Sequence, residues 1–193
     1  MASERRVMVA ITGASGMVYA RRLLEALSRA YDRVYLAASD NALDIMRDEL
    51  GVERLEQLLS AGDESKFRLF SSTDLHAPPA SGSHDYEGMA IVPCSMGVVG
   101  RIASGVSNDL VTRAADVCLK ERRKLVLVFR ETPLSLVHLR NLTALAEAGA
   151  VVLPAAPAFY GKPESIGDLV DFVVDRVLCV LGAGIRLEKG WGE

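Results

Sequence analysis

The sequence predicts a three-layer α/β domain, in which a parallel sheet is covered by helices on both faces. Three observations lead to this prediction. Short apolar runs alternate with stretches of helical periodicity along the chain. The runs are apolar throughout, which is typical of strands buried on both faces. Small-residue turns follow two of them directly and open helices, as strand–turn–helix units require.

In the first half, the elements follow from apolar spacing and from turn residues. Val7–Ile11 is a predicted strand, the turn Thr12–Gly16 ends it, and Leu23, Leu24 and Leu27 mark the next helix. After these we expect a strand at Val34–Ala37, a helix at Ala42–Leu50 and a weaker strand at Phe67–Phe70. Prolines and a glycine between Asp74 and Tyr86 predict an ordered loop.

In the second half, the same alternation recurs. The predicted elements, in order, are a strand at Met89–Pro93, a turn at Cys94–Gly97 opening a helix, a helix capped by Asn108 or Asp109 and running to Lys120, a strand at Leu125–Phe129, a helix from Leu136 ended by Gly149, a strand at Ala150–Leu153 and a helix at Ile166–Leu181 capped by Ser165. Leu187–Glu193 remains as a final segment with the single tryptophan, Trp191.

Size and composition predict one folded domain spanning residues 1–193. The 193 residues are 50% hydrophobic and 24% charged, which excludes disorder for the bulk of the chain. A net charge of -3 argues against nucleic acid as a partner. The chain contains no apolar run of the length that a membrane helix needs, so we expect no membrane association. Three widely spaced cysteines predict no disulfide framework and no metal site, and a cytoplasmic location fits them best.

The predicted carboxyl ends of the strands are where a ligand would bind. Ligands of such sheets sit there because helix N-termini direct free N–H groups at an anion. One glycine turn alone is also compatible with no ligand, but four small or polar strand ends favour a phosphate-bearing cofactor. A nicotinamide dehydrogenase is the rival interpretation. Met17 and Val18 follow Gly16 where the dinucleotide motif needs another glycine, and Tyr160 lacks a lysine four residues later.

Several charged residues are candidates for a site. Arg113 and Lys120 are seven residues apart on one predicted helix, so they share a face. Arg176 lies beside the apolar stripe of the last helix, where it can point inward, into an interface or to solvent. Glu131 follows Arg130 at the end of the most apolar strand, where either a catalytic group or a simple ion pair is expected.

The chain resembles the UbiX-type flavin prenyltransferases over nearly its whole length. The resemblance rests on Thr12–Gly16, Ala77–Ser83, Pro93–Ser95, Arg113–Val117 with Leu119–Arg122, Leu125–Val128 with Arg130 and Glu131, and Pro157–Tyr160 with Pro163. Several separate motifs in one order are more specific than any single glycine turn.

This resemblance implies a Rossmann-like, flavodoxin-like fold in a homo-oligomer, namely a dodecamer that is built of trimers. It implies a single flavin-binding prenyltransferase domain that joins the dimethylallyl group of dimethylallyl phosphate to N5 and then C6 of reduced FMN. The product, prenylated FMN, would serve a UbiD-type decarboxylase. An FMN-dependent cysteine decarboxylase-like flavoprotein and a non-enzymatic flavin carrier remain as alternatives.

The resemblance also implies roles for individual residues. The flavin would be bound by Gly13, Ala14, Ser15, Ser39, Ser95, Met96, Gly97, Val98 and Arg130, the prenyl phosphate by Arg113, Lys120, Tyr160, Arg176 and Trp191, and catalysis would use Ser15, Glu49, Lys120 and Glu131. Glu49 would act as base, and a protonated Glu131 beside Lys120 would donate to the leaving phosphate, which could also take the proton itself. Val98 and Gly161 depart from the family pattern, which usually has a hydroxyl residue and His or Asn there.

Overall fold

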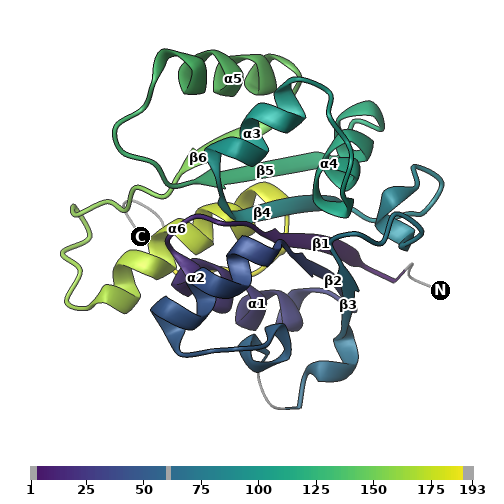
Figure 1. Ribbon diagram of the computed structural model, residues 1–193. Coiled ribbons are helices and arrows are strands. Elements are labelled where there is room, and N and C mark those ends of the chain that lie inside the picture. The colour runs from purple at the N-terminus through teal and green to yellow at the C-terminus, as the bar shows by residue number, and fades with distance from the viewer. Residues whose placement is uncertain (1–3, 60–61, 189–193) are drawn as a thin grey trace.

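The computed structural model describes residues 4–59 and 62–188 and contains a six-stranded parallel sheet (Figure 1). The strands are β1 (Arg6–Ile11), β2 (Arg33–Ala38), β3 (Phe67–Ser71), β4 (Gly88–Cys94), β5 (Lys124–Phe129) and β6 (Val151–Pro154). Their order across the sheet is β3-β2-β1-β4-β5-β6, and every neighbouring pair is parallel. This is the order of a doubly wound Rossmann sheet, so the predicted three-layer fold is confirmed.

Six α-helices cover the two faces of the sheet. They are α1 (Met17–Ala30), α2 (Asp40–Leu50), α3 (Met96–Ala103), α4 (Leu110–Lys120), α5 (Leu136–Glu147) and α6 (Ile166–Leu181), with short 3-10 helices at Leu55–Leu58, Glu64–Lys66 and Pro78–Ala80. Figure 1 shows α3, α4 and α5 on one face and α1, α2 and α6 on the other. Within the described ranges, no helix is long and apolar enough to cross a membrane.

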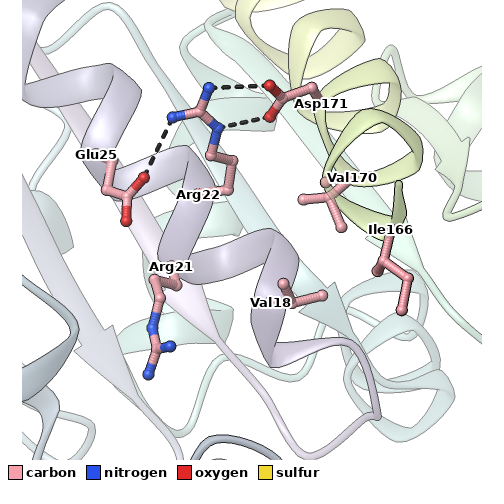
Figure 2. Close-up of a pocket in the computed structure, with 8 residues that line it drawn as sticks. Val18, Arg21, Arg22, Glu25, Ile166, Val170 and Asp171 are labelled. Atoms are coloured by element: carbon pink, nitrogen blue, oxygen red, sulfur yellow. Dashed lines mark hydrogen bonds and ion pairs between the residues drawn. The ribbon is translucent and has the colours of Figure 1, made fainter. Parts of the chain in front are cut away.

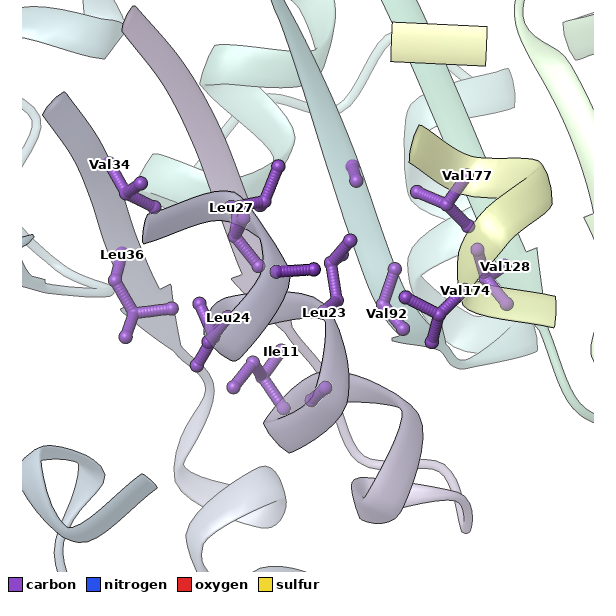
Figure 3. Close-up of a cluster of buried hydrophobic side chains, with 14 of the residues drawn as sticks. Ile11, Leu23, Leu24, Leu27, Val34, Leu36, Val92, Val128, Val174 and Val177 are labelled. Atoms are coloured by element: carbon purple, nitrogen blue, oxygen red, sulfur yellow. The ribbon is translucent and has the colours of Figure 1, made fainter. Parts of the chain in front are cut away.

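The core beneath α1 and α6 explains why both helices form where the periodicity predicts them. Leu23, Leu24 and Leu27 of α1 are fully buried and pack toward the sheet (Figure 3). Val174 and Val177 of α6 approach the same face. Burying one such leucine contributes roughly 1.5–3 kcal/mol, so this stripe fixes which face of each helix meets the sheet.

The cap residues set the helix boundaries closely. Asp109, one of the two predicted caps, accepts from Thr112 N–H at 2.7 Å, and Ser165 accepts from Asp168 N–H at 3.2 Å. The prediction placed the start of α2 two residues too late, because Ser39 already has the extended backbone of a cap. The predicted loop 74–86 contains one short 3-10 turn, Pro78–Ala80, in which the prolines occupy the first positions.

A threonine joins the ends of β1 and β4. Thr12 is fully buried, its Oγ1 donates to the Pro93 carbonyl at 2.9 Å, and it accepts from Ser95 N–H at 2.8 Å. These two strands are neighbours at the point where the strand order reverses, and ligands of doubly wound sheets bind there. The hydrogen bonds of Thr12 therefore fix the spacing of the two turns that we expect to form the site.

Candidate functional site

Glu49 closes the N-terminus of α1. Its carboxylate accepts hydrogen bonds from Gly16 N–H at 3.0 and 3.1 Å and from Met17 N–H at 2.8 Å. Gly16 has a φ of 112°, a left-handed conformation that glycine adopts without steric cost, and it turns these N–H groups toward Glu49. The chain thus fills with its own carboxylate the position at which dinucleotide-binding proteins hold a pyrophosphate.

The surroundings of Glu49 keep it ionised. Partial burial acts to raise its pKa, but hydrogen bonds from Ser15 and from the N–H groups of Met17 and Gly16 outweigh burial, and the pKa lies below the ordinary value. The positive charge of Arg130 lowers the pKa further, so Arg130 acts on the same edge of the sheet. The arrangement favours a base at this position and not an acid.

The N-terminus of α3 forms the second half of the edge. Ser95 Oγ accepts from Val98 N–H at 3.4 Å, so this N–H already has a partner within the chain. Met96 and Val98 are buried and provide an apolar wall. Cys94 is fully buried, which raises the pKa of its thiol to about 12 and excludes a reactive thiolate.

The two glycines of this edge differ in the space around them. A Cβ built on Gly97 would meet no atom within 4 Å, whereas one on Gly13 would lie 2.7 Å from Asn41 Cβ. Gly13 is therefore required by the close approach of α2, and Gly97 leaves open space at the start of α3. Ser39 precedes α2 with a hydroxyl that makes no capping hydrogen bond. The space beside Gly97 and the Arg130 cation are compatible with a negatively charged ligand at this edge.

Arg113 and Lys120 both face the proline loop, as their shared helix face predicts. Arg113 Nε donates to the Ala80 carbonyl at 3.0 Å, and its Nη1 pairs with Asp116 at 2.8 Å. Lys120 forms an ion pair with Glu121 close to Gly82.

The structure corrects the expected pairing of Glu131 with Lys120 within one chain. Lys120 ends α4 just before β5 begins, and Glu131 follows the end of β5, so the six-residue strand separates them. At about 3.3 Å per residue, the length of this strand is roughly 20 Å. Figure 1 shows α4 at the side from which the N-terminus enters the sheet. The Glu131 carboxylate instead accepts from Thr132 N–H at 3.1 Å.

The last helix buries a carboxylate. Asp175 is 2% exposed and accepts from Arg186 Nε at 3.0 Å and from Leu187 N–H at 2.8 Å. Arg176 is exposed in the single chain. Tyr160 is exposed too and packs edge-on against Phe172, with ring centroids 6.0 Å apart. Trp191 lies outside the described residues.

A groove between α1 and α6 is separate from these residues. Its volume is about 400 Å³, and its apolar lining includes Val18, Ile166 and Val170 (Figure 2). Arg22 crosses it to pair with Asp171 at 2.5 Å, which joins the two helices. None of the predicted site residues lines this groove, so we assign it no part in the site.

Sequence comparisons decide the family. The model of the Flavoprotein family matches residues 1–178. A flavin prenyltransferase UbiX of Pseudomonas aeruginosa is 44% identical, and the alignment covers 100% of this chain and 97% of the relative. A flavin prenyltransferase UbiX of Methanocaldococcus jannaschii is 42% identical, with 97% and 98% covered. This chain belongs to the UbiX flavin prenyltransferase family.

Solved structures agree with this assignment. A crystal structure of AnUbiX in complex with FMN and dimethylallyl pyrophosphate is 41% identical, with a TM-score of 0.88, covering 98% of this chain and 100% of that one. A dodecameric FMN-dependent UbiX-like decarboxylase from Escherichia coli is 37% identical, with a TM-score of 0.85, covering 96% and 99%. A cysteine decarboxylase, TvaF, is 17% identical with a TM-score of 0.60 and shares the fold alone.

The predicted resemblance to flavin prenyltransferases is thereby confirmed, whereas the roles of single residues stay predictions. Sequence reasoning missed Thr12 as the link between β1 and β4 and Asp175 as the anchor of the following segment. Both are polar residues in otherwise apolar surroundings: Thr12 ends a buried strand and Asp175 interrupts a run of buried valines. That pattern was the available signal, because a buried polar group has to be hydrogen-bonded.

Proposed function

We propose that this chain is a flavin prenyltransferase that joins the dimethylallyl group of dimethylallyl phosphate to N5 and C6 of reduced FMN. The observation that carries the proposal is the gathering of Ser15 and Arg130 around the ionised Glu49 at the carboxyl edge of the sheet, in a member of the UbiX family. A relative of high coverage holds FMN and dimethylallyl pyrophosphate together, which supports both ligands.

The residues at the carboxyl edge would bind the flavin. Gly13, Ala14, Ser15 and Ser39 would line one side, Ser95, Met96, Gly97 and Val98 the other, and Arg130 would supply positive charge. Reduced FMN would supply the nucleophilic nitrogen and ring carbon. The buried Met96 and Val98 would keep water away from the reactive allyl group, which otherwise captures it.

The carboxylates would serve proton transfer. Closing the ring onto C6 would consume the prenyl double bond, so one of its carbons would gain a proton while C6 loses one. Glu49, already ionised and hydrogen-bonded to Ser15, would take the proton lost from C6, directly or through Ser15. Glu131 would donate a proton to the leaving phosphate. General acid–base assistance of this kind is typically worth ~10²–10⁴ in rate.

The prenyl phosphate would be held by residues of more than one copy of the chain. Lys120 ends α4 just before β5 begins, at the opposite edge of the sheet from Arg130, so a second copy would bring it to the flavin. Arg113, Tyr160, Arg176 and Trp191 would complete the phosphate site. Leu136 and Val137, adjacent apolar residues at the start of α5, are both exposed, and a second copy could cover them. A 37% identical neighbour is dodecameric, and we propose a dodecamer here, built of trimers.

Mass analysis of the flavin tests the proposed reaction. Wild-type protein is incubated anaerobically with reduced FMN and dimethylallyl phosphate, and the extracted flavin should gain the mass of one prenyl group. Lys120→Ala should retain the flavin and lose most of the transfer. Unmodified flavin from the wild type, or carbon dioxide released from cysteinyl peptides, would contradict the proposal and support a flavin carrier or a cysteine decarboxylase.

We further propose that a UbiD-type decarboxylase in the cytoplasm uses the product.

A further inference from the structure

Four residues meet where α4 ends against the proline loop, and we call them the Gly82 cluster: Gly82, Lys120, Glu121 and Arg123. Arg123 Nη2 donates to the Gly82 carbonyl at 2.7 Å, and its guanidinium carbon lies 4.4 Å from the ring centroid of Tyr86. A Cβ on Gly82 would lie 2.6 Å from Lys120 Nζ and would collide with the Glu121 carboxylate. A side chain at this position would therefore displace the two charged head groups.

The end of α4 is shaped to hold these charges against the loop. Arg122 has a φ of 59°, and Arg123 N–H donates back to the Cys118 carbonyl at 2.8 Å. This is the backbone reversal that glycine usually makes after a helix, here built with an arginine at some steric cost. The reversal places Arg123 beside Gly82. Its buried Nη1 has no hydrogen-bond partner among the described residues, so the positive charge there is only partly compensated.

Glu121 is an unusual partner for Lys120. Side chains of adjacent helix residues point in different directions, so such pairs seldom form. A carboxylate at the end of a helix also faces the negative end of the helix dipole, which disfavours it. Glu121 nevertheless pairs with Lys120, and that lysine together with Arg123 lowers the pKa of the Glu121 carboxyl. The carboxylate is thus held at this position by the cations.

We propose that the Glu121 carboxylate competes with the substrate phosphate for the ammonium group of Lys120. The carboxylate pairs with Lys120 until the phosphate displaces it. The inference rests on the proposed function, in which Lys120 binds the prenyl phosphate. A phosphate monoester carries up to two negative charges and three acceptor oxygens, so it can displace a singly charged carboxylate, which a monoanionic ligand does far less readily. Glu121 would therefore set the affinity of the site and favour doubly charged phosphates.

The test measures binding of dimethylallyl phosphate and of inorganic phosphate to the FMN-loaded, assembled protein by calorimetry. We expect Glu121→Gln to lower the Kd about two- to fivefold, the range expected for one exposed ion pair. Glu147→Gln, an exposed glutamate at the end of α5, is the matched control and should leave the Kd unchanged. Glu121→Ala removes the carboxylate without introducing the amide group of glutamine, and it should also lower the Kd.

A double-mutant cycle identifies the route of the effect. In the Lys120→Ala background, Glu121→Gln should no longer tighten binding, because the cation for which both anions compete is gone. Equal or weaker binding in Glu121→Gln, or tightening that persists without Lys120, would overturn the inference. A wild type that transfers no prenyl group contradicts the proposed function. A wild type that transfers normally beside an unchanged Glu121→Gln contradicts only the role of Glu121.

Discussion

The carboxylate of Glu49 occupies the N-terminus of α1, where a second anion would otherwise bind. Its carboxylate covers the N–H groups of Gly16 and Met17, so a second anion gains little by approaching the start of α1. This explains in physical terms why the first glycine turn does not belong to a dinucleotide site, an interpretation that the sequence supported only through missing motif residues.

The same residue should couple stability to pH. The folded-state pKa of Glu49 is lowered, so its ionised form stabilises the fold above the ordinary value of 4.5, and this contribution is lost as pH falls through the lowered value. Glu49→Gln should lower the free energy of unfolding by about 1 kcal/mol at pH 7 and by much less at pH 3. Urea unfolding at both pH values measures this difference. Equal differences at the two pH values would contradict the role of the charge.

Two glycines at the edge of the site should respond oppositely to alanine. Gly97→Ala meets no atom within 4 Å, so it should leave folding intact or gain up to ~0.5–1 kcal/mol, yet weaken FMN binding about tenfold by filling the open space. Gly13→Ala should cost roughly 1–3 kcal/mol, because its methyl group meets Asn41. Thermal unfolding and quenching of FMN fluorescence measure both effects. Unchanged FMN affinity in Gly97→Ala would remove the flavin from this position.

Residue positions within a site were the hardest feature to predict from sequence. Spacing on one helix correctly predicted that Arg113 and Lys120 share a face, because helical geometry is local. It could not show which edge of the sheet that face reaches. The expected proximity of Lys120 and Glu131 failed for this reason, since the strand between them runs straight from one edge to the other.

At the scale of elements, α6 and the segment after it form one unit. The carboxylate of Asp175 is buried and accepts hydrogen bonds from Arg186 Nε and from Leu187 N–H. These bonds hold the segment after the helix against the body of the protein. Asp175→Asn should cost about 1–3 kcal/mol, because the amide cannot replace a carboxylate that accepts several hydrogen bonds. Limited proteolysis should then cut near residue 186 faster than in wild type. An unchanged cutting rate would show that other contacts hold the segment.

Elements themselves followed well from the sequence. Apolar runs bounded by small residues predicted all six strands, and cap residues such as Ser165 predicted helix starts. The misplaced features have a common cause. Ser39, before α2, donates its N–H to the Ile11 carbonyl, and Asp175 accepts from Arg186 and Leu187 beyond the end of its helix, and periodicity within a helix records neither contact.

At the scale of the whole molecule, the separation of Lys120 from Arg130 predicts complementation between chains. Lys120→Ala and Arg130→Ala should each be nearly inactive alone, but mixed assemblies made by coexpression should regain part of the wild-type rate, because some sites then combine intact residues from two copies. Assays of mass-verified mixed assemblies measure this. Mixtures as inactive as the parent variants would place the whole site in one chain.

The opposite placement of the two sets of residues on the sheet also links catalysis to dilution. A single chain would contain one half of a site at each edge of its sheet. A dissociated chain would therefore fold and bind flavin but would not transfer the prenyl group. Specific activity should then fall as the protein is diluted below the dissociation constant of its assembly, while flavin binding per chain falls much less. The concentration of the protein would itself become a control on the reaction rate, as it is for any catalyst whose centre exists only between molecules.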